Sequence, residues 1–163
     1  MNLRRRPRSV LVALSAVALG STVLVGCGSS DKQELRLSGG AKNFTMDPKF
    51  ETFCAAYDSL TLSLNDMAAS GASKEAFDKI LKNSKALVDV APDDIVDSVV
   101  TNDAILNAMN KAFADRKYDQ KKIDTDDSLR QEVQALYSQD GLAELTTKYA
   151  DYLVKNCGVS TAK

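Results

Sequence analysis

Apolar residues recur every three or four positions in five successive segments between Asp47 and Gly158, and this spacing restricts the fold more than any other feature. The spacing places the apolar side chains on one face of an α-helix. No segment shows the sustained alternation of β-branched residues that is typical of a strand. The sequence therefore predicts an all-α domain over residues 47–158, a small antiparallel bundle of about five helices.

Capping residues indicate where these helices begin and end. Asp47 with Pro48 is typical of a helix start, and Ser73 is a second N-cap. Gly71 ends the first helix, and Gly158 lies where a C-terminal cap belongs. We expect helices over residues 47–70, 73–91, 92–116, 127–138 and 141–156, with a joint near 101–103 and a polar connection over 117–124. The apolar faces of the last two helices comprise Leu129, Val133, Leu136, Tyr137, Leu142, Leu145, Tyr149, Tyr152 and Leu153.

The N-terminus has the pattern of an export signal. Four arginines lie within the first eight residues, and residues 10–25 carry no charge. A basic segment followed by a short apolar run is typical of a secretory signal. The run is shorter than the roughly 20 apolar residues of a membrane-spanning helix. The Arg5-Arg6 pair leaves ordinary secretion and twin-arginine export both open.

The residues after this run, Leu24-Val25-Gly26-Cys27, resemble the lipobox of bacterial lipoprotein precursors. The resemblance implies that the sulfur of Cys27 receives a diacylglyceryl group and that cleavage occurs just before it. We therefore expect a removed signal peptide over 1–26 and a lipidated Cys27 with a flexible linker to residue 46. Acyl chains such as palmitate would anchor the protein to the outer face of the cell membrane. Residues 159–163 would form a short tail.

Charge and composition exclude several classes of function. The whole chain has 21 basic and 22 acidic residues, and removing the four N-terminal arginines leaves 17 basic residues and a net charge of −5. An acidic domain without a basic patch is not expected to bind nucleic acid. The chain has no His, which excludes histidine-dependent catalytic triads and histidine-ligated metals.

Two cysteines remain once Cys27 is assigned to lipid. Cys54 lies on the apolar face of the first helix, and Cys157 lies at the end of the last helix. Exported proteins meet an oxidising compartment, so we predict a disulfide that joins the first and last helices. Two buried free thiols are the alternative, whereas a metal held by the pair would lack further ligands.

The combination resembles the small, two-cysteine, all-helical lipoproteins of high-GC Gram-positive bacteria. The matching parts are the lipobox at Cys27, Phe53-Cys54, the segment Ala91-Pro92-Asp93-Asp94-Ile95 and the closing Asn156-Cys157-Gly158. The resemblance implies the fold, the anchor and the disulfide. It implies no activity.

An acidic segment near the middle of the chain has two interpretations. It contains Asp89, Asp93, Asp94, Asp97 and Asp103, with no basic residue between Lys85 and Lys111. The segment is either a surface patch that binds a cation or a basic partner, or a solvated helix start whose acids complement the helix dipole. The second interpretation is favoured.

No catalytic motif, metal site or cofactor site is evident, so a non-catalytic interaction module with an envelope protein as its partner is the leading functional prediction. A carrier of a small apolar ligand and a carboxylate-based hydrolase are the alternatives. A filled core with one exposed apolar groove favours the module, a large dry cavity favours the carrier, and paired desolvated carboxylates favour the enzyme. The oligomeric state stays open.

Overall fold

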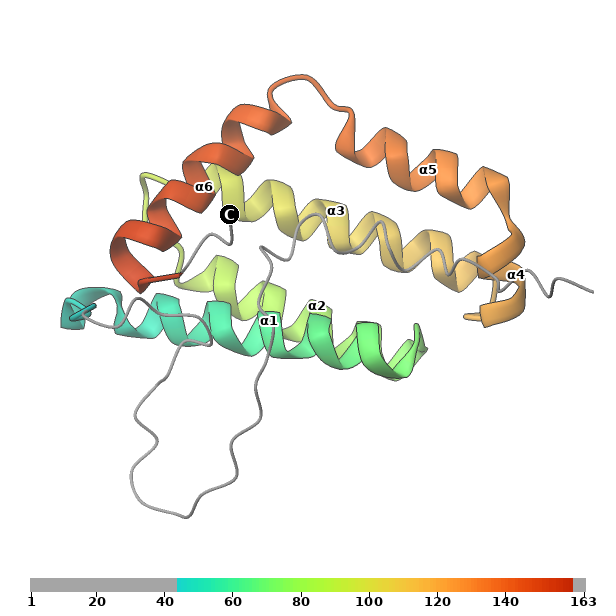
Figure 1. Ribbon diagram of the computed structural model, residues 1–163, viewed down its shortest axis with the longest axis horizontal. Coiled ribbons are helices and arrows are strands. Elements are labelled where there is room, and N and C mark those ends of the chain that lie inside the picture. The colour runs from blue at the N-terminus through green and yellow to red at the C-terminus, as the bar shows by residue number, and fades with distance from the viewer. Residues whose placement is uncertain (1–43, 160–163) are drawn as a thin grey trace, which may run out of the picture.

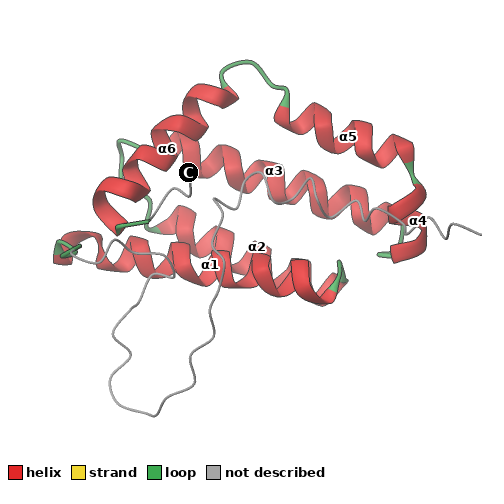
Figure 2. Ribbon diagram, viewed as in Figure 1, coloured by secondary structure: helices red, strands yellow, loops and turns green. Residues whose placement is uncertain are grey.

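The computed structural model describes residues 44–159, and this part of the chain is helical without a strand (Figure 2). The predictions for the signal peptide, for Cys27 and for most of the linker lie outside the described residues. The α-helices are α1 (Glu51–Ser70), α2 (Lys74–Asp89), α3 (Val96–Asp115), α4 (Gln120–Thr125), α5 (Asp127–Tyr137) and α6 (Leu142–Cys157), and the 3-10 turn η2 (Pro48–Phe50) precedes α1.

The helices form a bundle in which α1 packs on α2 and α2 packs on α3 (Figure 1). Helix α6 lies against both α1 and α3, and α5 lies against α3. Short connections reverse the chain between successive long helices, as in an antiparallel bundle. The predicted all-α fold is confirmed, although residues 44–159 contain six α-helices and not about five.

The predicted caps begin and end the helices with small shifts. Asp47 accepts a hydrogen bond from the backbone N–H of Lys49 and caps η2, so α1 itself begins at Glu51. Ser73 accepts from the N–H of Ala76 at the start of α2, as predicted. Gly158, in the left-handed region at φ 66°, ends α6.

Two boundary predictions in the middle of the chain were wrong. Residues 101–103 form no joint, and α3 is one helix, because Val99 and Leu106 on either side are buried in the core and hold the weak helix formers between them in register. The predicted connection over 117–124 contains α4. Asp119 caps α4, and its single apolar residue Ile123 is 2% exposed.

The core is filled by large apolar side chains from nearly every helix. Its fully buried members are Met67, Phe77, Ile80, Leu87, Ile95, Val99, Met109, Ile123, Leu129 and Leu153, together with both cysteines. On α5 and the first half of α6, however, most of the predicted inward residues are only half-buried. This part of the bundle is therefore closed less completely than the rest.

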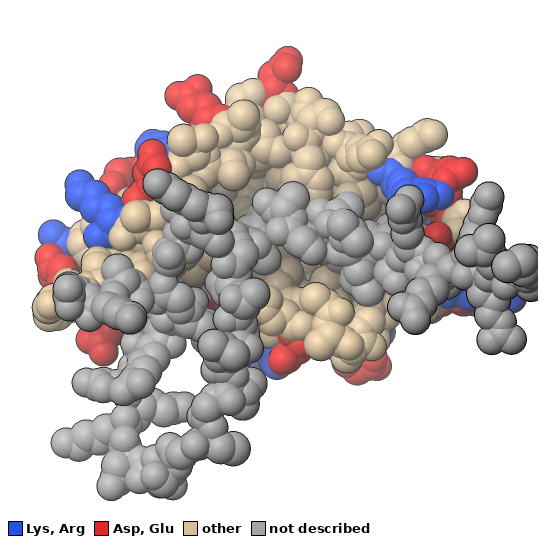
Figure 3. Space-filling model, viewed as in Figure 1, with Lys and Arg blue, Asp and Glu red and all other residues tan. Residues whose placement is uncertain are grey.

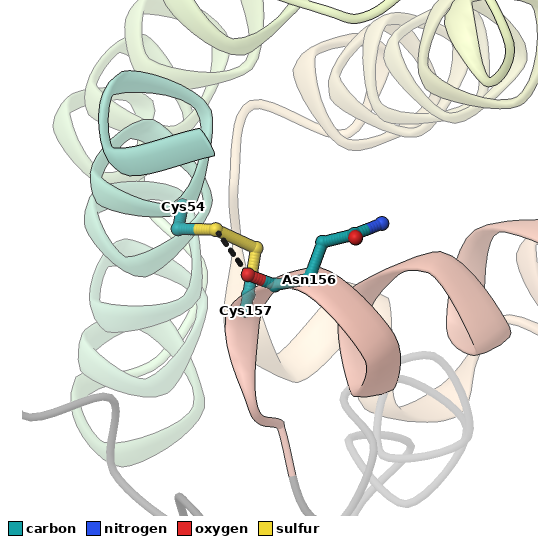
Figure 4. The surroundings of a disulfide bond; sticks show 3 residues. All are labelled: Cys54, Asn156 and Cys157. Carbon is teal, nitrogen blue, oxygen red and sulfur yellow. Dashed lines mark hydrogen bonds between the residues drawn. A yellow bond between two sulfur atoms is a disulfide. The ribbon is translucent and has the colours of Figure 1, made fainter. Parts of the chain in front are cut away.

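The disulfide between Cys54 and Cys157 joins α1 to α6, as predicted (Figure 4). The two Cα atoms are 5.5 Å apart and both residues are completely buried. The Sγ atom of Cys54 lies 3.7 Å from the carbonyl oxygen of Asn156, and because a disulfide sulfur carries no hydrogen, this is a packing contact. Phe50 and Phe53 meet the ring of Tyr152 edge-on beside the bond. The bond and the aromatic pairs together hold α6 on α1.

A candidate binding groove between α3, α5 and α6

The half-buried residues of α5 and α6 line a groove over α3, which we call the α3–α6 groove. It has a volume of about 420 Å³ and is half open to solvent. Its nine lining residues are Ser98, Asn102 and Ile105 from α3, Tyr137 from α5, and Leu142, Ala143, Leu145, Thr146 and Tyr149 from α6.

The course of the chain between α5 and α6 explains why the groove exists. Helix α5 packs on α3, and α6 packs on α1 and α3, but the two helices do not pack along each other. The connection between them ends at Gly141, whose backbone lies in the left-handed region at φ 79° and turns the chain sharply into α6. The two helices diverge from this turn (Figure 1). Among the described helices, α5 and α6 thus leave the first half of α3 incompletely covered.

An ionic cluster fixes the position of α5 on α3. The guanidinium of Arg116, just after α3, donates to a carboxylate oxygen of Asp126 at 2.6 Å and to one of Glu132 at 2.9 Å. It also donates to Ser128 Oγ and to the carbonyl oxygen of Ala112. Hydrogen bonds to Ser128, Arg116 and the N–H of Leu129 hold the pKa of Asp126 well below its usual range. Arg116 thus bridges two carboxylates of the α5 region and binds α5 to the end of α3.

The lining of the groove is uncharged. No acidic or basic residue is among its nine lining residues. In the upper part of the face in Figure 3, uncharged residues (tan) form a continuous surface, and the coloured charged residues lie around its margins. The groove therefore offers an apolar surface with a few neutral polar groups.

Two buried hydroxyl groups at the groove have no hydrogen-bond partner among residues 44–159: Ser98 Oγ and the phenol oxygen of Tyr149. Burial, and then the neighbouring Tyr57, raises the pKa of Tyr149 far above its usual value, so its hydroxyl stays protonated. A third hydroxyl, that of Tyr137, lies 3.5 Å from Met109 Sδ, and burial raises its pKa too. A buried hydroxyl without a partner costs about 1–3 kcal/mol, so Ser98 and Tyr149 have binding capacity that the described protein does not use.

The predicted acidic patch lies outside this groove. Its five aspartates are distributed over the end of α2, the α2–α3 turn and the first half of α3: Asp89, Asp93, Asp94, Asp97 and Asp103. Asp89 pairs with Lys85, and Asp103 accepts from the side chain of Asn107. In the described part of the chain, no three acidic or cysteine side chains are arranged to hold a metal ion. Asp97 lies in the first turn of α3, where the helix dipole favours an acidic side chain.

One carboxyl group has an unusual environment. Burial raises the pKa of Asp58 on α1 to about 6. No second carboxylate contributes to this shift, and Asp58 is not part of the groove lining. The paired, desolvated carboxylates expected of a hydrolase are thus not found at Asp58 or in the groove.

Sequence reasoning identified four of the nine lining residues of the groove. Tyr137, Leu142, Leu145 and Tyr149 were predicted to face inward, and they do, but toward an open groove. Ser98, Asn102 and Thr146 were not singled out. Small and polar residues at these positions are a weak sequence signal for a groove. Whether they line one depends on how far α5 and α6 diverge, and the sequence does not show this.

None of the helices within residues 44–159 is both long and apolar enough to cross a membrane. No protein-family model, curated protein or solved structure matches the chain.

Proposed function

We propose that the protein is a membrane-tethered extracytoplasmic lipoprotein that acts as a non-catalytic binding module, with the α3–α6 groove as its binding site. The observation that carries the binding role is a half-open, uncharged groove beside an otherwise filled core. Exposed apolar surfaces rimmed by polar residues are typical of interaction sites.

Two independent features support the extracytoplasmic location. Lipobox-like residues end at Cys27, directly after a basic and an apolar segment. The buried disulfide between Cys54 and Cys157 is of the kind that forms and persists in oxidising compartments. Both features also agree with the resemblance to small two-cysteine lipoproteins of high-GC Gram-positive bacteria.

The tether is tested by metabolic labelling of the full chain with a radioactive fatty acid in a bacterial host. We expect the label and the protein to be found together in the membrane fraction. Cys27→Ala should abolish the labelling, and Ser29→Ala, as a control two residues away, should leave it unchanged. Labelling that survives Cys27→Ala would contradict the assignment of the anchor.

The groove is tested in the same anchored chain with a photo-crosslinking amino acid at Ala143. A second chain carries the same group at Ala68, an exposed alanine on α1 outside the groove lining. We expect the group at position 143 alone to give a reproducible adduct in intact cells, with a partner or with a small ligand. Identical adducts at both positions, or none at position 143, would contradict binding in the groove.

A further inference from the structure

The size of the α3–α6 groove suits a small molecule better than a protein. Its volume of about 420 Å³ falls within the range of roughly 300–1,000 Å³ that is typical of ligand pockets. Nine of the described residues line it, whereas a specific protein interface involves about 20–30 residues on each side. A small molecule that fills the groove would therefore cover the apolar part of its lining by itself.

The charge of the lining restricts the ligand further. An ion that enters the groove gives up hydration and meets no opposite charge in the lining, which is unfavourable. The charged residues Glu144, Lys148 and Asp151 of α6 line a separate shallow depression. The groove and this depression have only Ala143 in common, so the charged residues of α6 do not contribute to the lining of the groove.

The two hydroxyls without partners indicate that the ligand is not a pure hydrocarbon. Ser98 is 5% exposed, and its oxygen is shielded from water, as is the phenol oxygen of Tyr149. Alanine and phenylalanine would give nearly the same packing without the cost of a buried, unbonded hydroxyl. A ligand with one hydrogen-bonding atom would supply the partner that these groups lack once the side chains that cover the two oxygens shift on binding.

We propose that the α3–α6 groove binds a neutral, mainly apolar small molecule that carries at least one hydrogen-bonding atom. This inference rests on the proposed function, because it assigns a ligand class to the same groove. Binding places the apolar part of the molecule against Ile105, Leu142 and Leu145 and its polar atom near Ser98 or Tyr149.

Two dyes with the same ring system test the charge of the ligand. N-Phenyl-1-naphthylamine is neutral and has one N–H donor, and 8-anilino-1-naphthalenesulfonate adds a negative charge. Both are titrated by fluorescence into the exported mature chain, residues 27–163, with Cys27→Ser to prevent acylation. We expect the neutral dye to bind at least tenfold more tightly. Equal affinities, or tighter binding of the sulfonate, would overturn the proposal of a neutral ligand.

Two matched tryptophan variants test the place of binding. Ala143→Trp fills the groove from the exposed side of α6, and Ala68→Trp puts the same side chain on an exposed position of α1. We expect Ala143→Trp to weaken binding of the neutral dye at least tenfold and Ala68→Trp to change it less than twofold, with unchanged helical circular dichroism. Equal effects of the two variants would overturn binding in the groove.

Tyr149→Phe tests the polar contact without changing the shape of the groove. We expect the neutral dye to bind about three- to tenfold more weakly, the loss that corresponds to one hydrogen bond. Unchanged affinity would overturn the role of this hydroxyl.

The proposal and the function it rests on can fail separately. If the neutral dye does not bind but the photo-crosslinking group at position 143 still gives a specific adduct in cells, the ligand class is wrong and the binding function stands. If both experiments are negative, the proposed function is overturned as well.

Discussion

At the scale of single residues, Gly158 shows how closely the start of the domain packs on its end. Gly158 ends α6 at φ 66°, and a Cβ atom added there would lie 2.5 Å from the ring of Phe44. Gly141 has a similar backbone at φ 79°, but a Cβ atom there would meet nothing within 4 Å. A side chain at Gly141 would meet backbone strain alone, whereas one at Gly158 would meet backbone strain and a steric clash.

We predict that Gly158→Ala lowers the free energy of unfolding by about 2–3 kcal/mol and Gly141→Ala by about 1 kcal/mol. Both variants carry the strain of a left-handed residue, and only the first must also displace the ring of Phe44. Urea denaturation followed by circular dichroism measures both values. Equal losses would mean that Phe44 is not held against Gly158 in solution.

A second residue, Asp58, gives the stability a dependence on pH. Its pKa is raised by burial from an ordinary 3.8 to about 6 in the folded protein, so folding favours its protonated form. The free energy of unfolding is therefore not reduced by Asp58 below the ordinary pKa. It falls as the pH rises from about 4 to 6, and the loss is complete above that range. We predict that Asp58→Asn removes this decline, so that its melting temperature exceeds that of the wild type at pH 7 and not at pH 3.5. A constant difference at both pH values would contradict this.

At the scale of the elements, Arg116 decides where α5 lies. Its side chain is 14% exposed and bonds to Asp126 and Glu132 around the start of α5. Arg130 on α5 pairs with its own neighbour Asp127 and is 48% exposed. A lysine cannot reproduce the several directed donors of a guanidinium.

We therefore predict that Arg116→Lys destabilises the protein by about 1–3 kcal/mol, whereas Arg130→Lys changes stability by less than about 0.5 kcal/mol. Both values come from chemical denaturation. Because the cluster holds α5 on α3, Arg116→Lys should also raise hydrogen exchange in α5 more than in α2. An equal increase in hydrogen exchange in α5 and α2 would show that the cluster does not position α5.

The elements also show how far the sequence determines the structure. Periodicity and caps located the long helices to within a few residues, because local spacing and capping chemistry depend on neighbours in the sequence. The helix α4 was missed because it has one apolar residue, Ile123, and no periodicity. The groove was missed because it forms where α5 and α6 diverge over α3. How these helices pack on α3 depends on tertiary contacts, which the periodicity of each helix does not specify.

At the scale of the whole molecule, the disulfide closes a loop of 103 residues that contains nearly the whole domain. We predict that the double variant Cys54→Ala, Cys157→Ala loses about 4–5 kcal/mol of stability, because its unfolded chain is no longer constrained. Guanidinium unfolding with and without a phosphine reductant measures the loss. The double variant itself should be unaffected by the reductant, and the control Cys27→Ala, which keeps the disulfide, should respond to the reductant as the wild type does. A wild type whose unfolding midpoint is insensitive to reductant would contradict the prediction.

The same bond determines how the domain would respond to a mechanical force. Ten described residues, 44–53, precede Cys54, and they can extend by at most about 34 Å before the pull reaches the sulfur atoms. From there the load passes through the covalent bond directly into α6, which forms one wall of the groove. A pull between the N-terminal side of the chain and α6 therefore bypasses α2, α3, α4 and α5, which lie within the loop that the disulfide closes and bear no tension.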